Sequence, residues 1–342
     1  MLIRFFISLL VLALALLAVA LMLPARVHVE RTITVERPPA IVFGLLNNFQ
    51  HFQAWSPWSE RDPNARYTFS GPDRGEGAKL AWSGDPRQVG EGWQQITASQ
   101  PYSTIRTHLD FGSQGEADAY FDISPVGRAT RLEWGFDSDV TRNRGFFEAI
   151  LGKYMGLLFD YWIGNDYEHG LERFKEYAES FPDADYSDLD IETVETSAEP
   201  ILFISTSSGQ SETAVANALG AAYGQISRFM ASRGLAHTAH PLSISHSRSD
   251  AGYEFDAAIP IGSTEVRPDG NIQFGYTPSG RAIRVVHKGP YARLGQTYDK
   301  IAAYLAVNRL EPSGISWEQY VSDPGETPAD ELITHIYFQL DE

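Results

Sequence analysis

Cysteine is absent from the 342 residues of this sequence, and basic residues are few. Without thiols the chain cannot form disulfides, zinc-thiolate sites or a thiol nucleophile, although this leaves the cellular compartment open. The 27 lysines and arginines are outnumbered by 44 aspartates and glutamates, which gives a net charge of −17. Such a charge repels phosphate groups, so no nucleic-acid partner is expected, because that partner requires a basic face.

Familiar catalytic motifs are missing as well. The sequence has no nucleophile elbow, no phosphate-binding glycine loop and no dinucleotide fingerprint. We therefore expect no cofactor and find no strong indication of catalysis. The share of hydrophobic residues, 43%, and that of charged residues, 21%, are typical of a globular protein.

One long hydrophobic run stands near the N-terminus. It extends from Phe5 to Leu23, contains only Ser8 as a polar residue, and ends before Pro24. At 1.5 Å per residue it is long enough to cross a hydrocarbon core of about 30 Å. A cleaved signal peptide is the alternative, with 18–20 as a small-residue cleavage site, but the run exceeds the usual hydrophobic region of about 7 to 15 residues. We predict a membrane anchor over 1–25, with a single pass through the cell membrane and the soluble domains on the extracytoplasmic side.

Two globular domains are predicted behind this anchor, over 28–182 and 190–342. Between them, residues 181–190 contain Pro182 and four aspartates without apolar periodicity, which indicates a solvated linker.

The first domain begins with an alternating segment, 28–36, that predicts a half-buried strand. Pro38 and Pro39 predict the start of a helix that runs to about Asn48. Residues 67–140 are typical of short antiparallel strands separated by turns. A helical pattern over 144–180 closes the domain, and we expect its apolar stripe to pack on the sheet. The stripe consists of Phe147, Ile150, Leu151, Tyr154, Leu157, Leu158, Tyr161 and Trp162.

This order of elements resembles the START-like, or polyketide cyclase (SRPBCC), superfamily. The segment 36–43, the aromatic run 55–58 and the terminal helix carry the resemblance. It implies an α+β helix-grip fold in which the sheet wraps the long helix around an apolar cavity. Six of the seven tryptophans lie in this domain, and we expect Trp82, Trp93 and Trp134 to line the cavity. The alternative is that they fill a solid core, since indole rings bury large apolar areas wherever they lie.

The second domain contains an internal repeat of strand, helix, strand and strand. The first half begins with the strand 200–205 and a helix near 214–233, and the second begins with 281–287 and a helix near 291–308. Two such modules normally pair about a pseudo-twofold axis and leave a pocket between them.

This domain resembles the GyrI-like effector-binding domain of AraC-type and related drug-sensing regulators. The matching segments are 287–291, 317–320, 322–324 and 327–337. The resemblance implies an aromatic pocket for amphipathic, often cationic molecules, with a buried acid two residues before a tyrosine in the last strand. Here His335 occupies the position of the acid and Tyr337 that of the tyrosine, on the same face of the strand. Asp256 occupies the matching place in the first half.

We accordingly predict a ligand pocket formed by His335, Tyr337, Trp317, Tyr320 and Asp256. The alternative is that these are ordinary core and strand residues. His335 with Asp256 or Glu331 is a weaker candidate for a general base that would hydrolyse electrophilic compounds.

A metal site from His237, His240, His246 and Asp250 is also conceivable, but a solvated loop is the better interpretation of that segment. We expect no metal.

These observations together predict a membrane-anchored protein that binds hydrophobic or amphipathic small molecules for sensing, sequestration or lipid handling. A hydrolase and a membrane-anchored interaction or adapter protein are the alternatives. A transcription regulator is disfavoured, because the sequence shows no helix-turn-helix motif.

Overall fold

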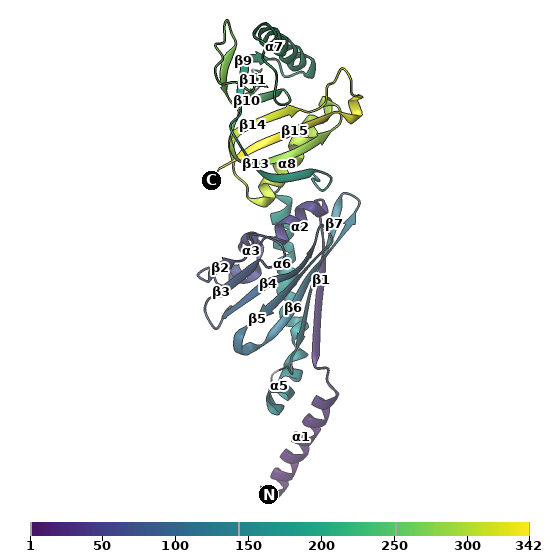
Figure 1. The fold of residues 1–342 in the computed structure, drawn as a ribbon. Coiled ribbons are helices and arrows are strands. Elements are labelled where there is room, and N and C mark those ends of the chain that lie inside the picture. The colour runs from purple at the N-terminus through teal and green to yellow at the C-terminus, as the bar shows by residue number, and fades with distance from the viewer. Residues whose placement is uncertain (1, 143, 250–251, 342) are drawn as a thin grey trace. The chain divides into compact units, whose positions relative to one another are not determined.

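The computed structural model describes residues 2–142, 144–249 and 252–341. The chain divides into two compact units, Met1–Ser187 and Asp188–Glu342, which we call unit 1 and unit 2 and describe separately. Each unit contains one antiparallel sheet and helices (Figure 1), so the predicted α+β class is confirmed.

The N-terminal helix α1 extends over Leu2–Met22, and its part Arg4–Met22 is long and apolar enough to cross a membrane. Most of its large apolar side chains are exposed, for example Phe5 at 65% and Leu10 at 60%. A buried core helix is therefore excluded, and a membrane span or a signal sequence remains.

Unit 1 is built on a seven-stranded antiparallel sheet in the order β1-β7-β6-β5-β4-β3-β2. Six strands form the predicted meander, and β7 returns to pair with β1 along its whole length (Figure 1). The strands are β1 (Arg26–Val35), β2 (Arg66–Ser70), β3 (Lys79–Ser83), β4 (Glu91–Gln100), β5 (Thr104–Asp110), β6 (Glu116–Val126) and β7 (Ala129–Asp139).

Four short helical segments connect β1 to β2. The first, α2, begins at Pro39, as the two prolines predict. It buries nearly all of its apolar side chains. It ends at Leu46, slightly before the predicted Asn48, and the three segments that follow were not predicted. The segments are α2 (Pro39–Leu46), η1 (Phe49–His51), α3 (Phe52–Trp55) and α4 (Pro57–Arg61).

The prediction of one long closing helix is wrong in two respects. The structure has two helices, α5 (Phe146–Gly156) and α6 (Phe159–Glu179), separated at Leu157 and Leu158. The predicted stripe also does not pack on the sheet, because most of its side chains are exposed, with Phe147 at 83% and Tyr161 at 68%. The sheet instead covers a different face of α6, formed by residues that follow the predicted stripe in the sequence. The buried residues of α6 are Gly164, Tyr167, Gly170, Leu171, Phe174 and Ala178.

Close contact between α6 and the sheet explains this choice of face. The rings of Tyr167 and Trp134 of β7 stack with centroids 3.7 Å apart, while Phe174 packs edge-on against Trp55 of α3. A Cβ atom at Gly170 would lie 2.8 Å from the Trp134 ring, so this position needs glycine. Small residues and rings on α6 thus meet the tryptophan-rich core, whereas the bulkier stripe has no partner surface there.

The predicted solvated linker is partly structured. Tyr186 is buried at 5% exposure, and its hydroxyl donates to the carbonyl of Ala40 over 2.8 Å. Strand β8 (Asp190–Thr196) begins at the last residue of the segment and joins the edge of the second sheet. Aspartates here face solvent while the tyrosine between them packs on unit 1.

Unit 2 has an eight-stranded antiparallel sheet in the order β12-β9-β11-β10-β14-β15-β13-β8. The two predicted halves, β9-α7-β10-β11 and β13-α8-β14-β15, meet where β10 pairs with β14 in the middle of the sheet. The elements are β9 (Pro200–Ser208), α7 (Glu212–Arg233), β10 (Leu242–Ser249), β11 (Gly252–Pro260), β12 (Gln273–Tyr276), β13 (Gly280–Lys288), η3 (Tyr291–Arg293), α8 (Leu294–Asn308), β14 (Pro312–Tyr320), η4 (Ala329–Glu331) and β15 (Ile333–Leu340).

Both long helices of unit 2 pack on the same face of this sheet. Helix α7 covers a cluster that includes Leu202 and Phe255, and α8 covers one that includes Val285 and Ile336. We call this the helix face. Alternation along each strand places the intervening residues on the opposite face.

Candidate ligand-binding sites

Unit 1 contains a cavity of about 530 Å³ between its sheet and α6. Aromatic side chains form much of its wall, among them Trp58, Trp82 and Phe136. The turn 112–116 and residues 138–142 border it, and both lie at the end of the sheet where β1 begins. The cavity therefore extends to the end of unit 1 at which β1 begins, next to α1.

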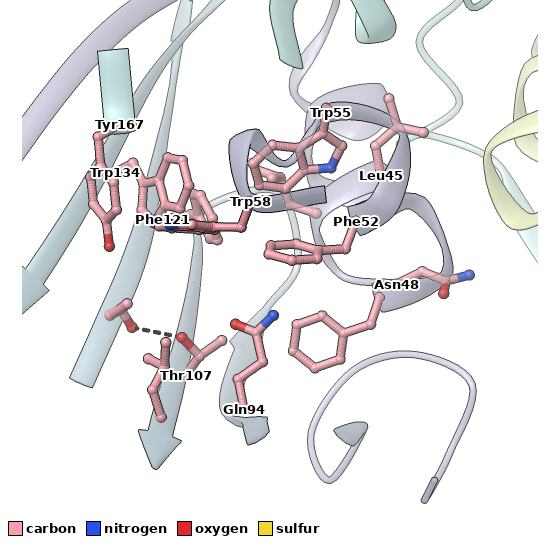
Figure 2. Close-up of a pocket in the computed structure, with 14 residues that line it drawn as sticks. Leu45, Asn48, Phe52, Trp55, Trp58, Gln94, Thr107, Phe121, Trp134 and Tyr167 are labelled. Carbon is pink, nitrogen blue, oxygen red and sulfur yellow. Dashed lines mark hydrogen bonds between the residues drawn. The ribbon is translucent and has the colours of Figure 1, made fainter. Parts of the chain in front are cut away.

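The inner end of this cavity is closed by packed rings, as Figure 2 shows. Trp134 lies between Trp58, at 5.8 Å, and Phe121, at 5.3 Å between centroids. The remaining void measures about 30 Å³, room for roughly one water. A ligand of any size is therefore limited to the outer part of the cavity.

Polar and charged side chains form the rest of the cavity wall, among them Glu116, Asp139 and Arg142. Arg61 and Asp166 form an ion pair there, and the amide of Gln94 points toward the void in Figure 2. Burial raises the pKa of the Tyr167 hydroxyl, which therefore stays protonated. A wall that combines aromatic rings with polar and charged groups suits a hydrophobic molecule that carries a polar end.

The three predicted tryptophans have different positions. Trp82 lines the cavity, and Trp134 borders the small inner void with only 3% exposure. Trp93 lies on the other face of the sheet, because it is paired with Ala81 rather than with Trp82, and the ammonium of Lys79 lies 3.6 Å above its ring. The structure thus brings Trp82 and Trp134 to the cavity region but not Trp93.

Unit 2 contains a groove of about 1550 Å³ on the helix face, bordered by α7 and α8. Its floor includes parts of β10, β11 and β14, where the two halves of the sheet meet. Five tyrosines line it, namely Tyr223, Tyr253, Tyr291, Tyr298 and Tyr320. The groove is therefore aromatic and also rich in hydroxyl groups.

Glu318 supplies a carboxylate in the middle of this groove. One of its oxygens accepts a hydrogen bond from the Tyr298 hydroxyl over 2.6 Å, and the other accepts from Tyr320 over 2.8 Å. Burial, followed by the charge of Glu318, raises the pKa of both tyrosines well above the usual value, so both remain donors.

Further acids line the groove around Glu318, namely Glu212, Asp299, Asp323 and Glu326. Arg248 is the one arginine among the described lining residues, and its guanidinium lies over the Tyr253 ring. The groove therefore carries an excess of negative charge, which favours a cationic ligand.

Most of the predicted pocket residues lie on the opposite face of the same sheet. His335 and Tyr337 alternate with Ile336, which packs under α8, and Trp317 alternates with Glu318. Trp317 and Tyr337 stack there with centroids 4.8 Å apart. Of the predicted pocket, Tyr320 belongs to the described lining of the groove.

Asp256 does not pair with His335. It lies on β11, which two strands, β10 and β14, separate from β15. One of its oxygens contacts the Nε2 atom of His246 at 2.8 Å, and the other has no partner among the described residues. The predicted general base of His335 with Asp256 is therefore not assembled.

The histidines considered for a metal site are not gathered together either. His246 lies in strand β10 rather than in a loop, and His237 forms an isolated bridge to Ile261. Asp250 lies outside the described residues. Among the residues that are described, no group of three or more histidines, aspartates or glutamates is arranged to hold a metal ion.

The pH dependence of stability tests the surroundings of His335. Burial, assisted by Arg284 and His240, lowers its pKa from 6.5, while Asp190 and Glu192 act in the other direction. Because the unfolded chain then binds more protons, the contribution of His335 to stability is lost as the pH falls below the unfolded pKa. We expect wild-type melting temperature to fall more than that of His335→Gln between pH 7.5 and pH 5.5. Equal falls would contradict this placement of His335.

Glu318 was missed although the segment that contains it was identified. The pair Glu318 and Tyr320 has the spacing of acid and tyrosine that the GyrI-like resemblance implied for the last strand. An acid and a tyrosine two residues apart therefore also occur on β14, the strand before the last one, where they share one face.

Two family profiles match the chain. Residues 26–179 match the polyketide cyclase / dehydrase and lipid transport family, and residues 189–341 match the GyrI-like small molecule binding domain. No curated protein matches the chain.

Several solved structures are similar in fold at low identity. A cryo-EM structure of the EcmrR-DNA complex in EcmrR-RPo is 16% identical, with a TM-score of 0.42, over 58% of this chain and 73% of that one. A hydrolase from Listeria innocua is 12% identical, with a TM-score of 0.35, over 49% and 98%. Ara h 8.0201 is 9% identical, with a TM-score of 0.33, over 45% and 99%.

The two profile matches cover unit 1 behind α1 and nearly all of unit 2. Both families comprise domains of the small-molecule-binding type. This chain therefore carries a domain of the polyketide cyclase / dehydrase and lipid transport family followed by a GyrI-like small molecule binding domain.

Proposed function

We propose that this protein is a membrane-anchored receptor that binds amphipathic cations in the groove of its GyrI-like domain. The observation that carries the proposal is the Glu318 carboxylate, held by Tyr298 and Tyr320 in an aromatic groove with further acids around it. A carboxylate oriented by two hydroxyls attracts a positive charge, and tyrosine rings add cation–π attraction. This chemistry agrees with the ligands that the GyrI-like resemblance implies.

The proposed anchor is α1, whose apolar side chains are exposed over its length. Amphipathic cations partition into membranes, so a receptor fixed to the bilayer works where its ligand is concentrated. We propose a single pass with the folded units on the extracytoplasmic side, and a role in sensing or sequestration. The cavity of unit 1 adds a second site for a hydrophobic molecule with a polar end.

Two ions of nearly equal size and opposite charge test the groove. We expect the purified full-length protein in a non-ionic detergent to bind tetraphenylphosphonium at least about tenfold more tightly than tetraphenylborate, which corresponds to about 1.4 kcal/mol. Isothermal titration calorimetry measures both affinities. Equal affinities, or a preference for the anion, would remove the cation-binding proposal.

A substitution that fills the cavity tests unit 1. Ile163 on α6 lines the cavity, and tryptophan at this position adds bulk to the cavity wall. We expect Ile163→Trp to weaken binding of the fluorescent apolar probe 1-N-phenylnaphthylamine by about tenfold. Val126→Trp, at an exposed position at the far end of β6, is the matched control. The same loss in both variants would show that the probe does not report on this cavity.

A further inference from the structure

An unpartnered apolar surface lies on α5 and on the residues after it. The exposed side chains are Phe146, Phe147, Leu151, Met155, Leu157 and Leu158, with Phe147 at 83% and Leu151 at 62%. We call this surface the α5 patch. A contiguous group of this kind is uncommon on a protein surface in water and indicates contact with another apolar phase.

Helix α5 lies directly beside α1 (Figure 1). The Tyr154 hydroxyl of α5 donates to the main-chain carbonyl of Leu16 in α1 over 2.6 Å. Leu16 lies six residues before the end of α1 at Met22, which is about 9 Å along the helix axis at 1.5 Å per residue. The α5 patch therefore continues the apolar surface of α1 at the depth of its last turns.

The charged groups of the segment, Glu148, Lys153 and Asp160, suit the level of the lipid headgroups rather than the centre of the bilayer. The Glu148 carboxylate accepts from the main-chain N–H of Gly145 over 3.0 Å, and Asp160 is paired with Arg31 at 2.9 Å. Tyr161 and Trp162 follow at the start of α6 and are exposed. Aromatic residues with one polar atom are typical of the level of lipid headgroups.

One part of the unit 1 cavity lies at the same end of the unit. Arg26 of β1 pairs with Asp139 of β7, and the N–H of Val140 donates to the carbonyl of Ala25, three residues after α1. Val140 and Phe159, which flank α5 in the sequence, both line the cavity. The same short stretch of chain thus joins α1, the α5 patch and the cavity.

We propose that α5 and the start of α6 are embedded in the bilayer beside α1, so that the unit 1 cavity opens at the lipid surface. The occupant of the α5 patch is then the acyl region of the membrane. The cavity receives its ligand, an apolar molecule with a polar end, from the lipid phase rather than from water. This inference rests on the proposed membrane span of α1.

The absence of cysteine makes a direct test available, because any introduced cysteine is the one thiol in the chain. Single variants Leu12→Cys in α1, Phe147→Cys and Leu151→Cys in α5, and Glu176→Cys on the exposed face of α6 are spin-labelled. The full-length protein is reconstituted in phosphatidylcholine nanodiscs. Electron paramagnetic resonance then compares collisions of each label with oxygen, which is enriched in hydrocarbon, and with a water-soluble nickel chelate.

We expect oxygen collisions to exceed nickel collisions at Leu12, Phe147 and Leu151, and the reverse at Glu176. A lipid-like signal at Leu12 with water-like signals at Phe147 and Leu151 would overturn the inference and leave the anchor intact. A water-like signal at Leu12 would instead contradict the anchor itself. Labels in α5 that are shielded from both reagents and broadened by a neighbouring label would show that a second copy of the chain covers the patch, which also overturns it.

Discussion

Glu318→Gln is expected to weaken binding of tetraphenylphosphonium by roughly 30-fold, about 2 kcal/mol. The amide keeps the shape of the side chain but removes its negative charge. It also presents an N–H group to one of two tyrosine hydroxyls, Tyr298 or Tyr320, that now donate to the carboxylate. Calorimetry on the full-length protein measures the change.

Glu265→Gln is the matched control for that substitution. Glu265 is exposed and does not belong to the described lining of the groove, so the variant removes the same charge from the protein without touching the site. We expect it to retain wild-type affinity within about twofold. If Glu318→Gln also keeps wild-type affinity, Glu318 is not the cation-binding group and the proposed function loses its main support.

The second large effect concerns the stability of unit 1. Phe174 is fully buried and packs against Trp55 with centroids 5.2 Å apart. We expect Phe174→Ala to lower the free energy of unfolding by about 3 to 5 kcal/mol, because it removes a ring and leaves a cavity in the core where α6 packs against Trp55 of α3. For a unit of this size the melting temperature should fall by roughly 6 to 20 °C.

Tryptophan fluorescence follows this transition, since six of the seven tryptophans lie in unit 1. Glu176→Ala, at an exposed position on the same helix, should change the melting temperature by less than about 2 °C. A similar small change for Phe174→Ala would show that α6 does not depend on this contact for its place on the sheet.

The error at the closing helix of unit 1 shows that an apolar stripe does not identify the surface that covers it. The spacing of three and four from Phe147 to Trp162 correctly indicates helix, and most of this segment is helical. The spacing does not say whether water, lipid or protein covers the stripe. The sheet packs on the face with Gly170, because a Cβ atom there would lie 2.8 Å from the Trp134 ring.

The difference between the predicted GyrI-like pocket and the observed groove has another origin. Alternation correctly places His335 and Tyr337 together, and Glu318 and Tyr320 together, on one face each. Which face of a strand lies under the helices depends on how the two halves of the repeat pack. The long helices cover the face with Glu318. The face with His335 lies on the opposite side of the sheet.

The amino-acid sequence by itself therefore determined most of the elements of both domains, the internal repeat of the second domain, the apolar N-terminal helix and the two families. These features depend on local periodicity and on residues close together in the chain. The tertiary structure alone decided which faces are covered, that Glu318 is held by two tyrosines, and that the α5 patch adjoins α1. Those outcomes depend on contacts between residues that are distant in the sequence. The periodicity of strands and helices does not specify such contacts.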